Sequence, residues 1–217
     1  MAGSAFHPED IARAAIDARL VACGWIAQSR SEMNVGAAQG VAVREFQTAS
    51  GPVDYAIFVD RRLCGVIEAK AEGTTLSGFS EQAERYMAGA PECLVRDSGQ
   101  VRFEYVASPT EILFRDHADP APVSRRVFAF HRPESLARWL KEPATLRRRV
   151  RPMPPMNVEG LRAYQVEAVN GVEASLAQNH PRALVQMATG AGKTYTAATL
   201  SYRLLAHAGF RRILFLA

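Results

Sequence analysis

The clearest pattern in the sequence is a pair of apolar, β-prone segments, Val53–Val59 and Leu63–Lys70, with a tight turn between them near Arg61-Arg62. Apolar residues fall on both faces of each segment, whereas a strand with one face in water alternates apolar and polar residues. The pattern therefore predicts two neighbouring strands in the interior of a sheet that is covered on both sides.

Other segments of the chain show helical spacing of apolar residues or strand-like alternation. The predicted helices are His7–Cys23, Gly78–Ala90, Pro133–Leu140, Leu161–Ala177 and one that begins around Lys193. The predicted strands besides the first two are Val41–Phe46, Cys93–Arg96, Val101–Ala107, Val127–Phe130, Arg182–Met187 and Arg212–Leu216. Residues 29–40, 73–77 and 116–124 are predicted to be loops. Helices alternating with strands indicate the α/β class.

Residues 143–157 interrupt this pattern with four arginines and three closely spaced prolines, which predicts a linker between two domains, 1–142 and 158–217. The arginines are Arg147, Arg148, Arg149 and Arg151. They fit either a solvated linker or contacts with DNA phosphates.

Composition sets broad limits on these two domains. The chain has 217 residues, a net charge of +4 and a pI near 9.2, which suits a polyanionic partner. The three cysteines are far apart and odd in number, which indicates free thiols in a reducing compartment. The sequence has neither a signal-peptide pattern nor an apolar run long enough to span a membrane, so we expect a cytoplasmic protein.

Three charged residues lie within the apolar strands that open the pattern: Asp54, Glu68 and Lys70. Charges in such a segment need partners, because burying an unpaired charge is costly. Two carboxylates beside a lysine indicate a metal site that cuts a phosphodiester, although a buried ion pair would give the same pattern. In this interpretation Asp54 and Glu68 bind Mg²⁺ and Lys70 positions the attacking water.

This metal site depends on the register of the two strands. A two-residue turn at Arg61-Arg62 would pair Asp54 with Ala69 and point Asp54 away from Glu68, because strand side chains alternate between faces. The interpretation therefore requires a three-residue turn or a β-bulge.

Residues 188–194 read A-T-G-A-G-K-T and lie between a predicted strand and a predicted helix, as in a phosphate-binding loop. Two glycines permit the tight turn whose N–H groups wrap phosphates, Lys193 pairs with the β- and γ-phosphates, and the Thr194 hydroxyl binds Mg²⁺. Met187 stands where the strict pattern has glycine. The candidate ATP-binding residues are Thr189, Gly190, Ala191, Gly192, Lys193 and Thr194.

Several motifs resemble those of known families. Asp54 with V-I-E-A-K at 66–70 resembles the PD-(D/E)xK nucleases, and Gln82 with Tyr86 matches the QxxxY helix found beside that core in some of them. The segment L-R-A-Y-Q-V-E-A-V at 161–169 resembles the Q-motif of helicase-type motors, which makes Gln165 the candidate adenine contact.

In this order and spacing, the motifs resemble the R (motor) subunit of type I restriction endonucleases. The resemblance implies a PD-(D/E)xK nuclease domain, a mixed sheet flanked by helices, followed by the start of a RecA-like helicase motor. It implies Mg²⁺-dependent cleavage of double-stranded DNA coupled to ATP-driven translocation, with methyltransferase and specificity subunits as partners. The catalytic residues would be Asp54, Glu68, Lys70, Gln82 and Tyr86, assisted in related nucleases by an acidic residue such as Glu9 or Asp17.

The resemblance also implies that further motor segments follow residue 217, so the chain is expected to be an amino-terminal fragment that at most binds nucleotide weakly. Two other interpretations remain open. The first domain could be a degenerate nuclease fold that only binds DNA or a partner subunit, or the chain could be a plain helicase with an accessory domain.

Overall fold

The structure is a computed structural model that describes residues 8–48, 51–74, 76 and 101–216, and the side chains of the first helix from residue 11 onward. The chain divides into two compact units, each described by itself below. The first unit comprises residues 1–117 and 124–142, and the second comprises 118–123 and 143–217. The loop 118–123 therefore belongs to the second unit, although the residues on either side of it belong to the first.

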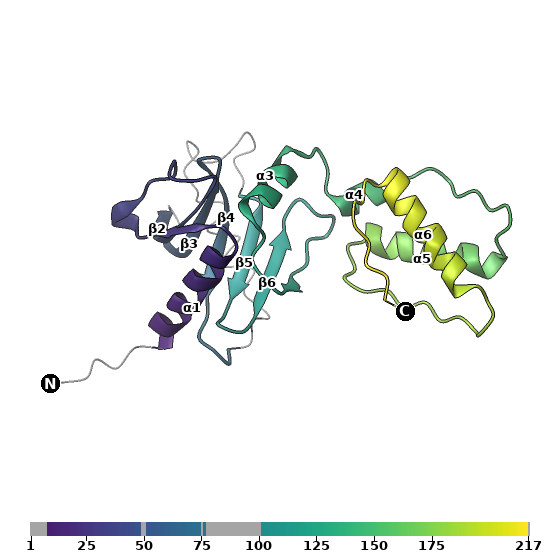
Figure 1. The fold of residues 1–217 in the computed structure, drawn as a ribbon, viewed down its shortest axis with the longest axis horizontal. Coiled ribbons are helices and arrows are strands. Elements are labelled where there is room, and N and C mark those ends of the chain that lie inside the picture. The colour runs from purple at the N-terminus through teal and green to yellow at the C-terminus, as the bar shows by residue number, and fades with distance from the viewer. Residues whose placement is uncertain (1–7, 49–50, 75, 77–100, 217) are drawn as a thin grey trace. The chain divides into compact units, whose positions relative to one another are not determined.

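Among the described residues, a mixed sheet of seven strands forms the centre of the first unit, in the order β1 to β7 along the sheet; Figure 1 shows this sheet. The β1–β2 and β4–β5 pairs are parallel and the other neighbours are antiparallel. The strands are β1 (Ile26–Gln28), β2 (Gly40–Thr48), β3 (Gly51–Val59), β4 (Arg62–Ala69), β5 (Phe103–Ala107), β6 (Ile112–Asp116) and β7 (Arg125–Val127).

Two apolar clusters lie on the two faces of this sheet. The larger contains residues of helices α1 (Pro8–Ala22) and α3 (Pro133–Lys141), among them Ile16, Leu20 and Leu136. The smaller gathers alternate residues of β2, β3 and β4, such as Val43 and Phe58, which are completely buried. The prediction of a sheet buried on both faces is therefore confirmed.

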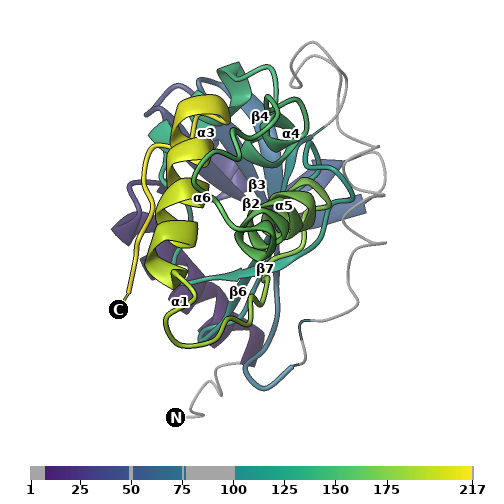
Figure 2. The ribbon, with the colours of Figure 1, turned by 90° about the vertical axis from the view of Figure 1, so that its right-hand side faces the viewer.

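The second unit contains three helices: α4 (Leu146–Val150), α5 (Ala163–Ala177) and α6 (Lys193–His207). Figure 2 shows α6 beside α5. A bidentate ion pair joins the two helices, with Arg203 Nε 2.6 Å from Glu173 Oε1 and Arg203 Nη2 3.0 Å from Glu173 Oε2. A small apolar cluster centred on Val150, Leu204 and Ala208 packs between α4 and α6.

Several expectations about local structure were wrong. Residues 182–187 and 212–216 were predicted to be strands, but neither forms a strand. An apolar, β-prone sequence becomes a strand only when its N–H and C=O groups find a ladder partner, and neither segment has one in the described part of the chain. The predicted strand 127–130 is also displaced, since β7 ends at Val127.

Residues 143–157 are not simply a linker, because they contain α4. The Thr145 side chain caps α4 by accepting a hydrogen bond from the Arg148 N–H at 3.3 Å. Three of the arginines donate to carbonyl oxygens of the same unit: Arg147 to His180, Arg148 to Ala118 and Arg151 to Ala177. The run therefore helps to hold the second unit together.

His131 gives the first unit a pH-dependent stability. Its Nδ1 lies 2.7 Å from the Tyr105 hydroxyl, and its ring packs edge-on against Trp139. Burial, together with the positive charge of Arg125, lowers the pKa of His131 from 6.5 to about 4. The neutral form is therefore the one the folded protein favours.

We expect this group to contribute stability that is complete above pH 6.5 and is lost as the pH falls towards 4, by about 3 kcal/mol in total. Urea denaturation followed by the fluorescence of Trp25 and Trp139, both in contact with His131, measures this loss. Glutamine does not titrate, so the free energy of unfolding of the His131→Gln variant should fall by about 3 kcal/mol less than that of the wild type over the same pH range. An equal fall in both proteins would contradict the assignment.

Candidate functional site

The turn between β3 and β4 lies at Asp60 and Arg61, one residue earlier than the sequence indicated. Both residues have positive φ angles, 49° and 68°. These angles are typical of two-residue type I′ hairpin turns, whose twist matches that of the strands. Arg62 is already the first residue of β4, where it pairs with Val59.

A β-bulge follows this turn. Phe58 pairs with Leu63, whereas Ile57 pairs with Gly65, so Cys64 is an extra residue on β4. The Cys64 thiol is buried and donates to the Ile57 carbonyl oxygen at 3.4 Å. A bulge was one of the two solutions that the sequence interpretation required, and its presence is confirmed.

The bulge decides which residue lies opposite Asp54. With the two-residue turn alone, Asp54 would lie opposite Ile67. Past the bulge Tyr55 pairs with Ile67. The same register, continued by one residue, would bring Asp54 opposite Glu68 instead of Ile67.

The contacts of the three charged residues place them at one end of these strands. Asp54 Oδ2 accepts a hydrogen bond from the Ala69 N–H at 2.8 Å, so this carboxylate lies against the backbone between Glu68 and Lys70. Glu68 Oε1 forms an ion pair with Lys70 Nζ at 2.5 Å. The Lys70 N–H donates to the Ala107 carbonyl oxygen at 2.8 Å, which fixes the backbone of Lys70 against β5.

The two carboxylate oxygens of Glu68 differ in their contacts. Its side chain is only 11% exposed, and Oε2 is buried without a hydrogen-bond partner among the described residues. Buried carboxylate oxygens are normally paired. An unpaired one beside a second carboxylate fits a hard cation such as Mg²⁺, which often takes only one or two protein carboxylates and completes its shell with other oxygens. In the described part of the chain, no group of three or more His, Cys, Asp or Glu residues could hold a metal ion.

The other residues expected at this site divide into two groups. Gln82, Tyr86 and the side chain of Glu9 lie outside the described residues. Asp17 is engaged elsewhere: its carboxylate accepts from the Tyr55 hydroxyl at 2.9 Å and forms an ion pair with Arg44 at 2.9 Å. Burial and the Asp17 charge raise the pKa of Tyr55, which keeps its proton on this bond.

The phosphate-loop sequence forms a turn and a helix start. Gly190 and Gly192 have φ angles of 77° and 81°, and α6 begins at Lys193 with Gly192 as its N-cap. Lys193 Nζ donates to the carbonyl oxygens of Met187 and Ala188 at 3.2 and 3.1 Å, so it lies folded over the loop. The free N–H groups at the start of α6 suit an anion, whereas Lys193 would have to leave the two carbonyl oxygens to reach one.

Gln165 contacts the loop directly. Its Nε2 donates to the Ala191 carbonyl oxygen at 3.0 Å, and its Oε1 accepts from the Arg162 N–H at 2.9 Å. The side chain is therefore a brace between the start of α5 and the loop, and the residue is 5% exposed. Each amide atom has capacity for one further hydrogen bond, which an adenine contact would use.

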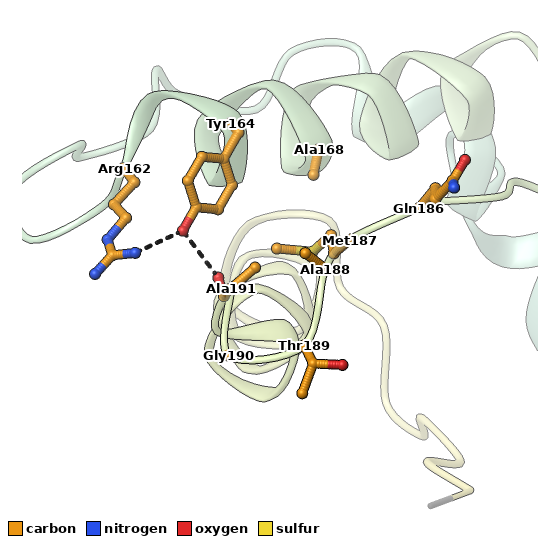
Figure 3. A pocket seen from close by; sticks show the side chains of 9 residues that line it. All are labelled: Arg162, Tyr164, Ala168, Gln186, Met187, Ala188, Thr189, Gly190 and Ala191. Atoms are coloured by element: carbon orange, nitrogen blue, oxygen red, sulfur yellow. Dashed lines mark hydrogen bonds between the residues drawn. The ribbon is translucent and has the colours of Figure 1, made fainter.

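A cavity of about 430 Å³ opens between the start of α5 and residues 186–191 (Figure 3). Two side chains that the sequence interpretation did not single out line it: Tyr164, whose hydroxyl donates to the Ala191 carbonyl oxygen at 3.2 Å, and Arg162, whose Nη1 lies 3.0 Å from that hydroxyl. Residues 186–191 form the opposite wall. An aromatic ring and a cation beside a phosphate loop suit a nucleotide base and its phosphates.

The two loop glycines allow a matched test of this packing. A Cβ on Gly192 would meet Gln165 Nε2 at 2.5 Å, whereas one on Gly190 would meet nothing within 4 Å. Gly190→Ala should cost about 1–2 kcal/mol for a left-handed alanine. Gly192→Ala should cost about 0.5–1.5 kcal/mol more, because Gln165 Nε2 must leave the Ala191 carbonyl oxygen. Hydrogen exchange of the α6 amides measures both, and equal protection in the two variants would contradict the Gln165 brace.

Family models match two parts of the chain. Residues 30–111 match the family described as "Type I restriction enzyme EcoKI endonuclease subunit second domain", and residues 159–217 match "Type III restriction enzyme, res subunit". The type I restriction enzyme EcoKI endonuclease subunit of Escherichia coli K12 is 30% identical over 259 aligned positions, which cover 96% of this chain. The chain is a homologue of the type I restriction enzyme endonuclease subunit.

This homologue spans 22% of the length of the EcoKI subunit. The EcoAI endonuclease subunit of Escherichia coli is 45% identical over 56 residues, which are 26% of this chain and 7% of that protein. A fragment structure described as a HsdR subunit of a type I restriction enzyme from Vibrio vulnificus YJ016 is 23% identical, with a TM-score of 0.45 and coverage of 97% of this chain and 40% of that one. Among the described residues, no helix is long and apolar enough to cross a membrane.

Proposed function

We propose that the first unit is a PD-(D/E)xK-type nuclease domain that cuts double-stranded DNA in a Mg²⁺-dependent reaction. The observation that carries the proposal is that Asp54 bonds to the Ala69 N–H, between Glu68 and Lys70, while a buried Glu68 oxygen has no hydrogen-bond partner among the described residues. Asp54 and Glu68 would hold the metal through their carboxylate oxygens, with the Ala69 carbonyl as a further ligand. The bound metal would lower the pKa of a water molecule and offset the charge that develops on the phosphate.

Lys70 would position the attacking water for in-line attack on the phosphorus atom. Its ion pair with Glu68 keeps the ammonium group beside the carboxylate, and its backbone bond to Ala107 keeps the residue at the end of β4. Gln82 and Tyr86 would contact the DNA or orient the lysine from the predicted helix 78–90.

We further propose that the second unit begins an ATP-driven motor that brings DNA to the nuclease. The loop 189–194 would bind the phosphates, with Lys193 released from Met187 and Ala188 to reach them, and Thr194 would bind Mg²⁺. Gln165 would contact the adenine. The full-length protein would act in a restriction complex with methyltransferase and specificity subunits, as the family resemblance implies.

Cleavage of supercoiled plasmid by the full-length protein in its complex, with ATP and Mg²⁺, tests the nuclease assignment. We expect cleavage by the wild-type complex, no cleavage with EDTA, and none by Asp54→Asn, whose amide is a far weaker metal ligand than the carboxylate. Cleavage that persists in Asp54→Asn while translocation is normal would reject the site. It would favour a unit that only binds DNA or a partner.

A further inference from the structure

Arg13, on the face of α1 that meets the sheet, contacts the carboxylate proposed to bind metal. Its Nη2 lies 3.5 Å from Asp54 Oδ1, and its Nη1 donates to Glu45 Oε1 at 3.0 Å. Glu45 belongs to β2, where the pairs on either side of it place it opposite Asp54. One guanidinium group therefore bridges two carboxylates that face each other across β2 and β3.

The two halves of this bridge differ. The contact with Glu45 has the length and direction of a hydrogen bond, whereas the contact with Asp54 is a longer ion pair. The Asp54 side chain is 28% exposed and that of Glu45 is 65% exposed. The Arg13–Asp54 half is therefore the one that a competing cation can replace, while Glu45 retains the arginine.

The backbone of Arg13 is held in place. The Tyr55 hydroxyl lies 3.2 Å from the Arg13 carbonyl oxygen and 2.9 Å from Asp17 Oδ1, and Arg44 forms an ion pair with Asp17. These contacts fix α1 on the sheet at this level. The guanidinium group of Arg13 can change partners without any movement of the helix.

The charges around the site make this exchange favourable. Without metal, Asp54, Glu68 and Glu45 carry three negative charges against the two positive charges of Arg13 and Lys70. A divalent cation turns this balance of −1 into +1, the sign that suits a DNA phosphate. Asp54 Oδ2 stays on the Ala69 N–H, so only Oδ1 has to change partner.

We propose that Arg13 is a positioning residue that acts as the counter-ion of Asp54 in the metal-free site and is displaced by the divalent metal, with Glu45 as its tether. Arg13 then sets the metal affinity of the site. This inference rests on the metal site of the proposed function, and it assigns roles to two residues, Arg13 and Glu45, that the nuclease motif does not include.

Mn²⁺ binding to the 217-residue chain, measured by electron paramagnetic resonance of the unbound ion, tests this role. We expect Arg13→Met, which keeps the apolar stem, to tighten Mn²⁺ binding about fivefold, because a competing ion pair is lost. Arg13→Lys, which keeps the charge, should bind within about twofold of wild type. Thermal unfolding of each metal-free variant shows whether it is folded, and Arg13→Gln, which also removes the charge, takes the place of Arg13→Met if that variant does not fold.

Two matched controls separate the outcomes. Arg44→Met removes the same charge from a neighbouring site that contacts Asp17 instead of Asp54, and it should change Mn²⁺ binding less than twofold. An equal effect of both arginine variants, or no effect of Arg13→Met, would overturn the counter-ion role while leaving the metal site intact. If Asp54→Asn binds Mn²⁺ as tightly as wild type, the metal site itself is wrong, and the proposed function fails with it.

Discussion

Replacing Glu68 with glutamine should reduce DNA cleavage by the full-length complex at least about a hundredfold, without reducing its ATPase activity. Glu68 offers the buried oxygen that has no hydrogen-bond partner among the described residues. An amide cannot supply the negative charge at that position, and a metal–carboxylate contact at a reacting phosphate contributes several kcal/mol of transition-state stabilisation. The measurement is the single-turnover rate of plasmid cleavage, with ATP hydrolysis followed in the same reaction.

Glu104→Gln is the matched control for this variant. Glu104 is also a buried glutamate in the sheet. It lies on β5, opposite Val66 of β4, but its Oε2 already contacts His117 Nε2 at 2.8 Å. Loss of that contact should lower stability by about 1–3 kcal/mol and leave the cleavage rate within a few-fold of wild type. Equal loss of cleavage in both variants would mean that the Glu68 substitution lowers cleavage by destabilising the first unit.

Lys193→Ala should abolish ATP hydrolysis by the full-length complex and, with it, all cleavage that depends on translocation. Lys193 is the one side chain of the loop that can carry a positive charge to the β- and γ-phosphates, and its present partners are two carbonyl oxygens that it can leave. We expect a loss of at least about a hundredfold in ATPase rate, as is typical when a preorganised charge is removed from a transition state. A colorimetric phosphate assay with DNA present measures it.

Lys141→Ala is the control for this variant, because Lys141 is exposed at the last turn of α3, in the other unit. It should hydrolyse ATP at the wild-type rate. If Lys193→Ala keeps more than about a tenth of the wild-type ATPase activity, the loop is not the phosphate site.

The elements that the sequence predicted well are those whose own pattern is strong. The one-face spacing in His7–Cys23 and Leu161–Ala177 matches α1 and α5. The apolar segments Val53–Val59 and Leu63–Lys70 match β3 and β4. The two short strands β1 and β6 were missed. Three to five residues carry too little periodicity to separate a strand from a turn, and each of these is defined by the neighbour it pairs with.

The candidate site was predicted in part. Charges within apolar strands identified Asp54, Glu68 and Lys70, and the strand period alone required a bulge or a longer turn. The location of the bulge at Cys64 could not be predicted, because the two-residue turn at Asp60-Arg61 has no glycine or asparagine to mark it. Arg13 was missed for a different reason: an arginine on a helix has no signature until the fold brings it to a carboxylate.

The two predicted strands that did not form show that apolar composition alone does not predict a strand. Leu184 is 95% exposed and Leu214 is 83% exposed. Their segments have the composition of buried strands, yet a strand exists only with a partner, and composition does not say where that partner is. The loop and helix beside them were predictable, because Gly192 and the start of α6 depend on local backbone geometry.

The most direct test of the proposed nuclease site is the position of a bound divalent metal. Crystals of the 217-residue chain grown with Mn²⁺ can be measured at a wavelength where manganese scatters anomalously. We expect a peak about 2.0–2.3 Å from one oxygen each of Asp54 and Glu68, with Arg13 turned from Asp54 towards Glu45. A peak elsewhere, or a carboxylate pair that still holds only Arg13 and Lys70 at saturating Mn²⁺, would contradict the site.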